Sequence, residues 1–545
     1  MKKGLITGWL WLWCFSVLPA TASVDVSRLI KEQKNNDSAL QHENQRPKKD
    51  VFSAVGTQDS AQLIFPQESP CFPVDKLIIN DAFIHPAPLD NIRAASAGHC
   101  FGKQGIARLV QAVQDIFINQ GFITTRVVLP EQNLASHRLQ LTVIAGKIEK
   151  IVLAKRDISL SILPFKAGEI LNIRDIEQGL ENLQRVPGST VKIAIEPGTL
   201  EGYSNVVIYH QRTQRGNLRA SINNWGDKST GRQLASAAGY LYNPAHINDF
   251  FYLAASRSAG GKYNSLSSYY AFPYSYWEYE IFYSQSVSHQ FINTQESKLD
   301  YSGRSRYFSA RAARMLWRDR NKKVSAAVAL IKRKADYQLN DIRLKAQKRD
   351  LTNVRAAINY KKNMPGAMLD ATLAYQRFLT WPGGSLTADM KSGEASVSSQ
   401  RINLDMEYNK RLQISALPGY YTVKLGAQYA PAALILQDQF TLGSRWSVRG
   451  FENSGGIDGD SGFYLQNTLT MLTNLKSTEY YLGLDYGEIS NASLARHARL
   501  LGAVTGIKGQ AYGLGYHFSL STPLFYPATL NSDNYVINFN LSWQI

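Results

Sequence analysis

Long apolar runs are almost absent from this sequence of 545 residues. Beyond residue 22, no uninterrupted apolar segment approaches the roughly 20 residues that a membrane-spanning helix needs, and the mean hydropathy is -0.25. These features exclude a bundle of transmembrane helices. The proportions of apolar residues, 44%, and of charged residues, 19%, also exclude a disordered or collagen-like chain.

Acidic residues are outnumbered by basic ones. The chain has 43 Asp and Glu against 60 Lys and Arg, which gives a net charge of +17. The basic residues are scattered and no nucleic-acid recognition motif accompanies them, so we expect no nucleic-acid partner. A cationic aqueous channel or attraction to anionic lipid explains this charge as well.

The N-terminal segment has the order of a secretory signal peptide. Lys2 and Lys3 provide the positive charge, Leu5–Leu18 is apolar, and Ala20-Thr21-Ala22 supplies the small residues of a cleavage site. We therefore expect residues 1–22 to be a signal peptide. A membrane anchor is the alternative, but the apolar run is short for that purpose.

Cysteine is scarce, with 3 in the whole chain, and only Cys71 and Cys100 lie beyond the expected signal peptide. An even count in an exported chain predicts one disulfide between them. Two buried thiols are the alternative. The nine histidines form no pair at a spacing of four and no cluster with cysteine, so we expect no metal site and no cofactor.

The first part of the mature chain predicts a helix, a linker and two small domains. Residues 23–45 are polar and helix-permissive, and residues 46–69 are interrupted by prolines, which is typical of a linker. Residues 70–147 predict the order β-α-α-β-β, and residues 148–212 repeat it. The sequence therefore predicts two tandem α+β units.

From residue 213 to residue 545 the helical period disappears and alternating segments follow one another. In Tyr421–Tyr429 and in Tyr535–Ile545, apolar and aromatic residues occupy every second position. Repeated segments of about 10 residues with this period are typical of an outer-membrane barrel, although a β-sandwich also alternates. At about 21 residues for each strand and its connection, we expect a membrane β-barrel of about 16 antiparallel strands.

Three short motifs in the barrel region resemble those of a known family. They are Ser447-Val448-Arg449-Gly450-Phe451, Gly483-Leu484-Asp485-Tyr486-Gly487, and Asn224-Trp225-Gly226. With the layout of the chain, they resemble the outer-membrane transporters of two-partner secretion (the TpsB family, of the haemolysin-activator or contact-dependent inhibition type). The two α+β units then resemble POTRA domains, and residues 23–45 resemble a plug helix. Ile545 departs from the pattern, because barrel proteins often end in Phe.

The resemblance implies a specific contact inside the barrel. A long loop near residues 443–462 folds back into the pore, where Arg449 of its Val448-Arg449-Gly450-Phe451 tip pairs with Asp485 on the wall. The alternation supports this placement independently. Asp485 shares a register with Gly483 and Gly487, opposite to the apolar Leu482 and Leu484, so it should face the lumen.

The function implied by the resemblance is protein export. The POTRA domains, in the periplasm of a Gram-negative bacterium, would bind the secretion domain of one large partner exoprotein, and the outer-membrane barrel would pass it unfolded without ATP. A contact-dependent growth inhibition toxin is the cargo we expect, with a haemolysin or an adhesin as alternatives. Outer-membrane lipids and the barrel assembly machinery are the other expected partners.

Other functions were weighed against export. A barrel assembly or insertase factor of the same superfamily is the main alternative, and a passive porin leaves the two α+β units without a role. The segments around His99 and Ser461 resemble the sequence motifs that carry the catalytic histidine and serine of serine proteases. However, residues 213–545 are predicted to form a barrel, and Phe463 replaces the final glycine of the serine motif. We therefore expect no enzyme.

Overall fold

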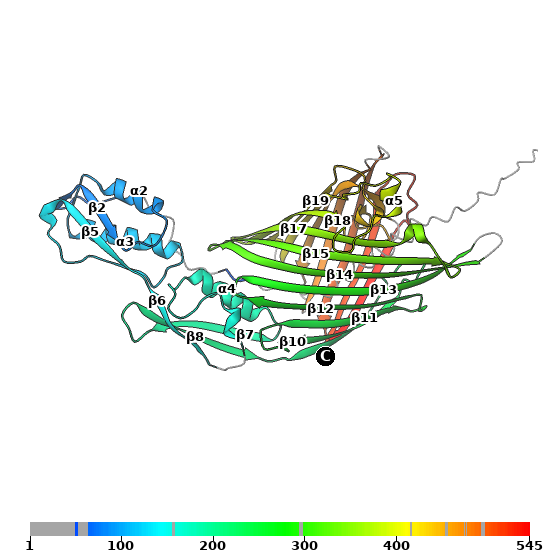
Figure 1. The fold of residues 1–545 in the computed structure, drawn as a ribbon, viewed down its shortest axis with the longest axis horizontal. Helices are drawn as coiled ribbons and strands as arrows, with labels where there is room; N and C mark the ends of the chain where they lie inside the picture. The colour runs from blue at the N-terminus through cyan, green and yellow to red at the C-terminus, as the bar shows by residue number, and fades with distance from the viewer. Residues whose placement is uncertain are drawn as a thin grey trace, which may run out of the picture.

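The structure is a computed structural model, and Figure 1 shows two small α+β units followed by a large barrel. It describes residues 50–52, 64–154, 158–293, 298–414, 417–452, 456–473, 475, 477–491 and 496–544. The expected signal peptide, the expected helix over 23–45, most of the expected linker over 46–69 and Ile545 lie outside the described residues.

The first unit is a three-stranded sheet covered by two helices. Its elements are β1 (Phe72–Val74), β2 (Lys76–Asn80), α2 (Ala87–Ser96), β3 (His99–Phe101), α3 (Lys103–Asn119), β4 (Arg126–Val128) and β5 (Arg138–Ile144). The sheet order is β2-β5-β4, with β2 parallel to β5. Leu109, Val113 and Phe117 of α3 are fully buried against Leu139 and Leu141 of β5, because the helical period places them on one face.

A small ribbon of β1 and β3 adds to this unit, and the sequence analysis did not predict it. Pro73 faces Cys100 in the ladder, and a disulfide joins Cys71 to Cys100 with 5.4 Å between their Cα atoms. Beside the ribbon, the Glu68 carboxylate accepts hydrogen bonds from the backbone N–H groups of Gly102 and Gly105 at the start of α3. A carboxylate at a helix N-terminus is favourable because the helix dipole is positive there.

The second unit repeats the sheet of the first. Its elements are β6 (Lys147–Leu153), α4 (Ile173–Gln184), β7 (Ser189–Pro197) and β8 (Tyr203–Arg212), with a short 3-10 turn at Leu160–Ile162. The order is β6-β8-β7, with β6 parallel to β8. Its core includes Ile148, Leu171 and Leu183. In the described residues, no helix is both long and apolar enough to cross a membrane.

Sixteen antiparallel strands close into the barrel within the described residues, which confirms the predicted fold class. They are β9 (Gly216–Asn223), β10 (Leu234–Tyr242), β11 (Phe250–Ser258), β12 (Tyr263–Tyr274), β13 (Trp277–Asn293), β14 (Lys298–Arg318), β15 (Lys322–Leu339), β17 (Arg349–Met364), β18 (Ala367–Leu379), β19 (Arg401–Ile414), β20 (Leu417–Tyr429), β23 (Ser461–Leu472), β24 (Thr478–Asn491), β25 (Arg496–Ala511), β26 (Leu514–Phe525) and β27 (Val536–Gln544). A two-residue strand, β16 (Ile342–Arg343), is added to β15.

The barrel closes where its first strand meets its last. β9 pairs with β27 from Asn223↔Asn540 to Arg219↔Gln544. The Asn224 side chain continues this ladder, since its amide donates to the carbonyl of Ile537 at 2.7 Å and its oxygen accepts from the backbone N–H of Phe539 at 2.8 Å. Closure pairs the edge strands, as a sheet surrounded by lipid requires.

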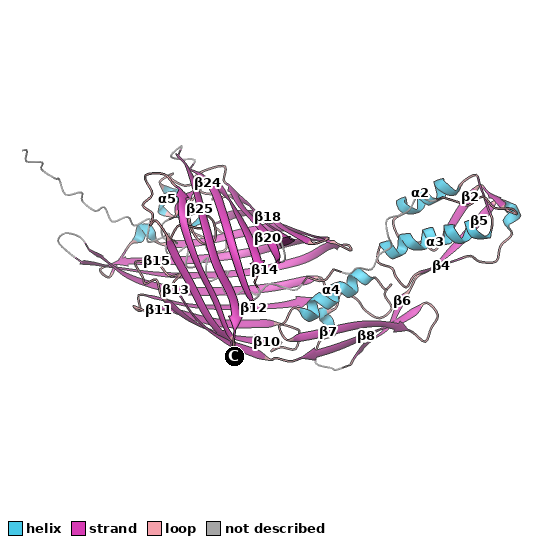
Figure 2. Ribbon diagram, turned by 180° about the vertical axis from the view of Figure 1, so that it is seen from behind, coloured by secondary structure: helices cyan, strands magenta, loops and turns pink. Residues whose placement is uncertain are grey.

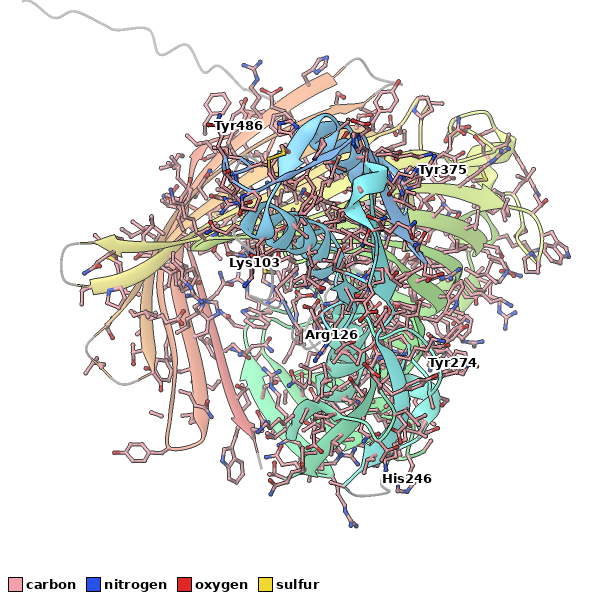
Figure 3. All side chains as sticks on the ribbon, turned by 90° about the vertical axis from the view of Figure 1, so that its left-hand side faces the viewer. Lys103, Arg126, His246, Tyr274, Tyr375 and Tyr486 are labelled. Atoms are coloured by element: carbon pink, nitrogen blue, oxygen red, sulfur yellow. A yellow bond between two sulfur atoms is a disulfide. The ribbon has the colours of Figure 1, made fainter. Side chains whose placement is uncertain are left out.

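The outer face of the barrel is apolar. Leu218 of β9 and Leu484 of β24 are 62% and 51% exposed, whereas Asp485 beside Leu484 is fully buried. Seen from the end at which the two α+β units lie, the labelled Tyr375 and Tyr486 lie on the outside of the wall (Figure 3), and Figure 2 shows β24 and β25 from behind. Exposed leucines alternating with inward polar residues are typical of a lipid-facing wall.

Candidate functional site

The connection between β20 and β23 folds back into the barrel. It runs over 430–460 and therefore begins earlier than the predicted 443, and it contains its own ribbon of β21 (Phe440–Leu442) and β22 (Ile457–Gly459). At its tip, Gly450 has φ +116°, and a Cβ there would lie 2.6 Å from the carbonyl oxygen of Thr522. Both the backbone conformation and the space require glycine at this position.

The tip of this loop is held by an ion pair between Arg449 and Asp485. The Nε of Arg449 lies 2.6 Å from Oδ2 of Asp485, and its Nη2 lies 2.6 Å from Oδ1. The backbone N–H of Arg449 also donates to Oδ2 at 2.9 Å. This bidentate arrangement is the strongest common form of guanidinium–carboxylate contact, and Asp485 is 0% exposed.

The barrel wall around the ion pair fits the loop closely. Nη2 of Arg449 also donates to the hydroxyl of Thr468 at 2.9 Å. A Cβ on Gly483 would lie 2.5 Å from that Nη2, and a Cβ on Gly487 would lie 3.0 Å from Val448. The two glycines therefore leave the space that the loop occupies.

Apolar side chains hold the same loop beside the ion pair. Val448 and Phe451 are 0% and 3% exposed and pack with Leu442, Ile489 and Leu500. Burying side chains of this size stabilises the docked loop by roughly 1.5–3 kcal/mol each. The docked loop thus depends on an apolar contact as well as on the ion pair.

A second set of contacts joins the loop to the connections beside the closing strands β9 and β27, which we call the barrel seam. The sequence did not predict these contacts. The guanidinium of Arg445 lies 3.6 Å from the ring centre of Trp225 and 4.6 Å from that of Trp446. Glu452 forms ion pairs with Lys228, at 3.1 Å, and with Arg232. The signal was partly visible, because the Asn224-Trp225-Gly226 motif carries one of the two rings.

Lys228 and Arg232 lie on the connection after β9, and Lys228 also pairs with Asp533 on the connection before β27, at 3.1 Å. Glu452 of the loop therefore contacts the same cations that bridge the closing strands. Loop and seam share this ionic cluster.

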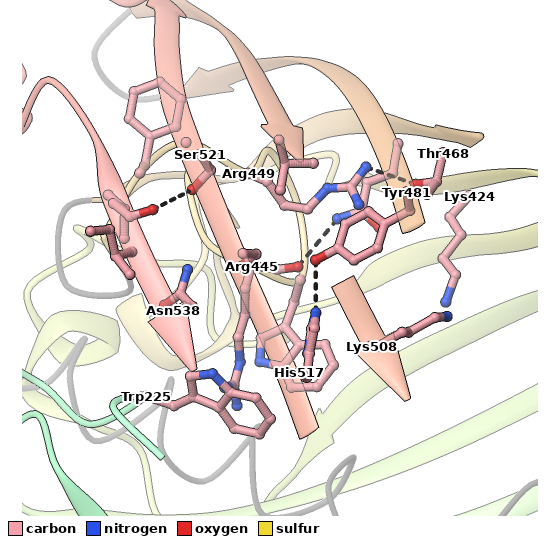
Figure 4. A pocket seen from close by; sticks show the side chains of 18 of the residues that line it. Trp225, Lys424, Arg445, Arg449, Thr468, Tyr481, Lys508, His517, Ser521 and Asn538 are labelled. Carbon is pink, nitrogen blue, oxygen red and sulfur yellow. Dashed lines mark hydrogen bonds between the residues drawn. The ribbon is translucent and has the colours of Figure 1, made fainter. Parts of the chain in front are cut away.

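A cavity of about 540 Å³ lies in the lumen beside the loop (Figure 4). Its lining includes Arg449, Lys424 and Lys508, and the hydroxyl of Tyr481 is hydrogen-bonded to His517 at 2.7 Å. Each of these three cations is paired with a carboxylate: Arg449 with Asp485, Lys424 with Glu407, and Lys508 with Glu479.

The residues of the protease-like boxes do not meet. His99 lies in β3 of the first α+β unit, next to Phe65, and Ser461 begins β23 of the barrel, where its hydroxyl accepts from the backbone of Ala430. Within the described ranges, no three His, Cys, Asp or Glu side chains are placed to hold a metal ion.

The mouth of the barrel on the side of the α+β units contacts the second of these units and the linker. Lys323 of β15 pairs with Glu181 of α4 and with Asp50 of the linker, the latter at 3.1 Å. Asp50 also lies 2.9 Å from Lys361. Arg318 donates to the carbonyl of Val51 at 2.9 Å. The expected linker therefore contacts the barrel wall and α4 together.

Two carboxyl groups of α4 lie at this junction, where Glu177 is buried and Asp175 is half-buried. Burial raises the pKa of Glu177 above its ordinary value, with Arg174 and Arg318 opposing the shift. Burial also raises the pKa of Asp175, against the hydrogen bond from Tyr276. A raised carboxyl pKa contributes stability at low pH that is lost as the pH rises through the folded-state value.

Replacing Lys323 with glutamine should loosen α4 from the barrel mouth. Only 3% of the Lys323 side chain is exposed, so its loss leaves Glu181 and Asp50 without this partner, at a cost of about 3 kcal/mol. Hydrogen exchange of the α4 amides should accelerate about 100-fold. Lys322→Gln is the matched control, because Lys322 is next to Lys323 in the sequence and its side chain makes no ion pair within the described residues. Equal exchange in both variants would contradict this role.

Comparison with known families agrees with the layout of the chain. Residues 202–509 match the haemolysin secretion/activation protein family ShlB/FhaC/HecB. Residues 73–146 match the ShlB-type POTRA domain, and residues 147–197 match a POTRA domain.

Curated relatives and solved structures cover most of the chain. Outer membrane transporter CdiB-2 of Burkholderia pseudomallei is 27% identical over 97% of this chain and 99% of its own. Hemolysin transporter protein ShlB of Serratia marcescens is 27% identical over 78% of this chain and 77% of its own. The structure of CdiB from Escherichia coli has a TM-score of 0.85 at 24% identity, over 97% of this chain and 100% of its own, and so shares the fold.

Proposed function

This chain belongs to the haemolysin secretion/activation protein family ShlB/FhaC/HecB, and we propose that it exports one large partner exoprotein in an unfolded state. It is an outer-membrane transporter of two-partner secretion, with its POTRA domains in the periplasm. The observation that carries the proposal is a docked loop inside a closed barrel whose periplasmic mouth bears two POTRA domains. A diffusion pore needs no periplasmic domains.

The POTRA sheets would capture the secretion domain of the partner by strand addition. Their sheet orders leave β4 at one edge of the first unit, and β6 and β7 at the edges of the second. An exposed strand edge binds an extended segment through backbone hydrogen bonds. Folding of the exported partner outside the cell would then drive transport, since no ATP is supplied in the periplasm.

The N-terminal segment would close the pore at rest. Residues 23–45 are proposed as the plug helix, and the contacts of Asp50 with Lys323 and Lys361 support this, because they bring the following linker to the barrel wall. Arg449 and Asp485 would keep the loop docked. Release of the plug, with the loop still anchored, would open a polar path.

The cargo we propose is a contact-dependent growth inhibition toxin. In support, two relatives named CdiB align with 97% and 99% of this chain, against 78% and 90% for the hemolysin transporters ShlB and HpmB. The remaining proposed partners are outer-membrane lipids around the barrel and the assembly machinery that inserts it. Neither nucleic acid nor catalysis has a part in this proposal.

Co-expression with the partner exoprotein tests the proposal. The full-length chain should place the partner in the medium, and a variant lacking residues 70–212 should leave it in the periplasm. The amount of barrel in the outer membrane must be equal in both. Export that persists without the POTRA domains would overturn the proposal, and a general loss of other barrel proteins on depletion would favour an assembly factor.

A further inference from the structure

A cluster of cations lies on the outer wall of the barrel, on strands β14 and β15. Four residues make up this outer cation cluster: Arg304, Arg306, Lys332 and Lys334. In the ladder, Lys332 faces Phe308, and Leu330 faces Ala310. Phe308 and Leu330 are 38% and 37% exposed on the lipid-facing side. Residues two apart on a strand share a face, so the cluster also points outward.

The cluster lies just beyond the extracellular edge of the apolar wall. Since β9 rises from the periplasmic POTRA domains and successive strands alternate, β14 descends from the cell surface, starting at Lys298. Phe308 therefore lies deeper in the membrane than Arg306, and Val328, 56% exposed, lies deeper than Lys332. Cations that follow an aromatic residue at the end of an apolar band lie at the level of lipid headgroups.

The four cations of the cluster outnumber the two carboxylates beside them, which are Asp350 and Asp336, and Asp336 directly faces Arg304 in the ladder. Arg306 directly faces Lys334, and like charges at facing positions destabilise a sheet. One carboxylate, Asp350, serves both lysines, at 2.6 Å from Lys332 and 3.7 Å from Lys334. Lys332 also donates to the hydroxyl of Thr352 and to the carbonyl of Gly383, so the arginines and Lys334 are the cations left for a ligand. Arg304 and Arg306 are exposed and form no side-chain hydrogen bond or ion pair with any described residue.

We propose that the outer cation cluster binds the phosphate groups of a phosphorylated glycolipid in the outer leaflet. Guanidinium groups bind phosphate through paired hydrogen bonds, and the adjacent Phe308 and Leu330 would contact the acyl chains of the same molecule. The position at headgroup level favours a lipid over a soluble anion. The proposal rests on the outer-membrane location of the barrel and not on the export of a partner.

Native mass spectrometry of the full-length protein in detergent tests this site. The protein is titrated with bisphosphorylated lipid A, with dephosphorylated lipid A and with inorganic phosphate. A cation near a membrane surface contributes roughly a fivefold gain in affinity. Arg304→Gln/Arg306→Gln/Lys334→Gln should therefore bind bisphosphorylated lipid A about 100-fold more weakly than the parent protein.

The matched control removes three outward cations from the periplasmic end of the wall: Lys322→Gln/Lys362→Gln/Lys410→Gln. It should keep the affinity of the parent protein. Equal losses of lipid A affinity in the two variants would overturn the proposal. It would also be overturned if the parent protein bound dephosphorylated lipid A as tightly as bisphosphorylated lipid A. Displacement of the lipid by inorganic phosphate at similar concentration would also overturn it, because a free anion would then suffice. The measurement needs no partner exoprotein, so it is independent of the export assay.

Discussion

Arg449→Ala is expected to lower export of the partner at least about tenfold while the barrel remains in the outer membrane. Removing the guanidinium leaves the Asp485 carboxylate buried at 0% exposure without its bidentate partner. Breaking a buried pair in this way costs about 3–5 kcal/mol, which is about as much as the burial of Val448 and Phe451 together contributes. The docked loop should therefore be released, and the fraction of partner in the medium measures the effect.

Two further variants separate the ion pair from simple loss of charge. Arg449→Lys should retain part of the export, because an ammonium reaches Asp485 but cannot bind both carboxylate oxygens in plane. Arg499→Ala is the matched control: Arg499 is paired with Glu488 at 3.0 Å and its side chain is 65% exposed. Export at parental level in Arg449→Ala, or an equal loss in Arg499→Ala, would refute the anchoring role.

The barrel could be predicted from the sequence because its main signal is local. A period of two specifies which side chains share a face, and this placed Asp485 opposite to Leu484 before any strand partner was known. The predicted order β-α-α-β-β over residues 70–147 likewise rests on local periods, and the apolar face of α3 packs on β5.

Short ribbons and contacts between loops could not be predicted in this way. β1 and β3 have three residues each, too few for any period to be recognised. The in-folded loop begins before the predicted 443, because Leu434 and Ile435 also belong to it and are buried there. Arg445 meets Trp225 only after the barrel closes, so no local pattern records the contact.

Gly502→Ala is expected to displace the loop from the opposite side of the same contact. Gly502 faces Asp485 in the β24–β25 ladder, and a Cβ on it would lie 1.7 Å from the carbonyl oxygen of Arg449. The obstacle is backbone, so no side-chain rotation relieves it, and overpacking of this kind costs at least about 1–3 kcal/mol. Moving the Arg449 backbone away draws its guanidinium out of line with the carboxylate, and export should fall about tenfold.

The matched control is Gly239→Ala in β10, where the added Cβ would have Leu218 as its nearest neighbour, at an ordinary 3.5 Å. Export should be unchanged in that variant. If Gly502→Ala acts through the ion pair, the double variant Gly502→Ala/Arg449→Ala should export no less than Arg449→Ala, because residues acting on one contact are not additive. A double variant about tenfold worse than either single one would show that the close approach at Gly502 serves another purpose. Outer-membrane levels of all four proteins, checked by their heat-modifiable mobility, distinguish failed docking from failed assembly.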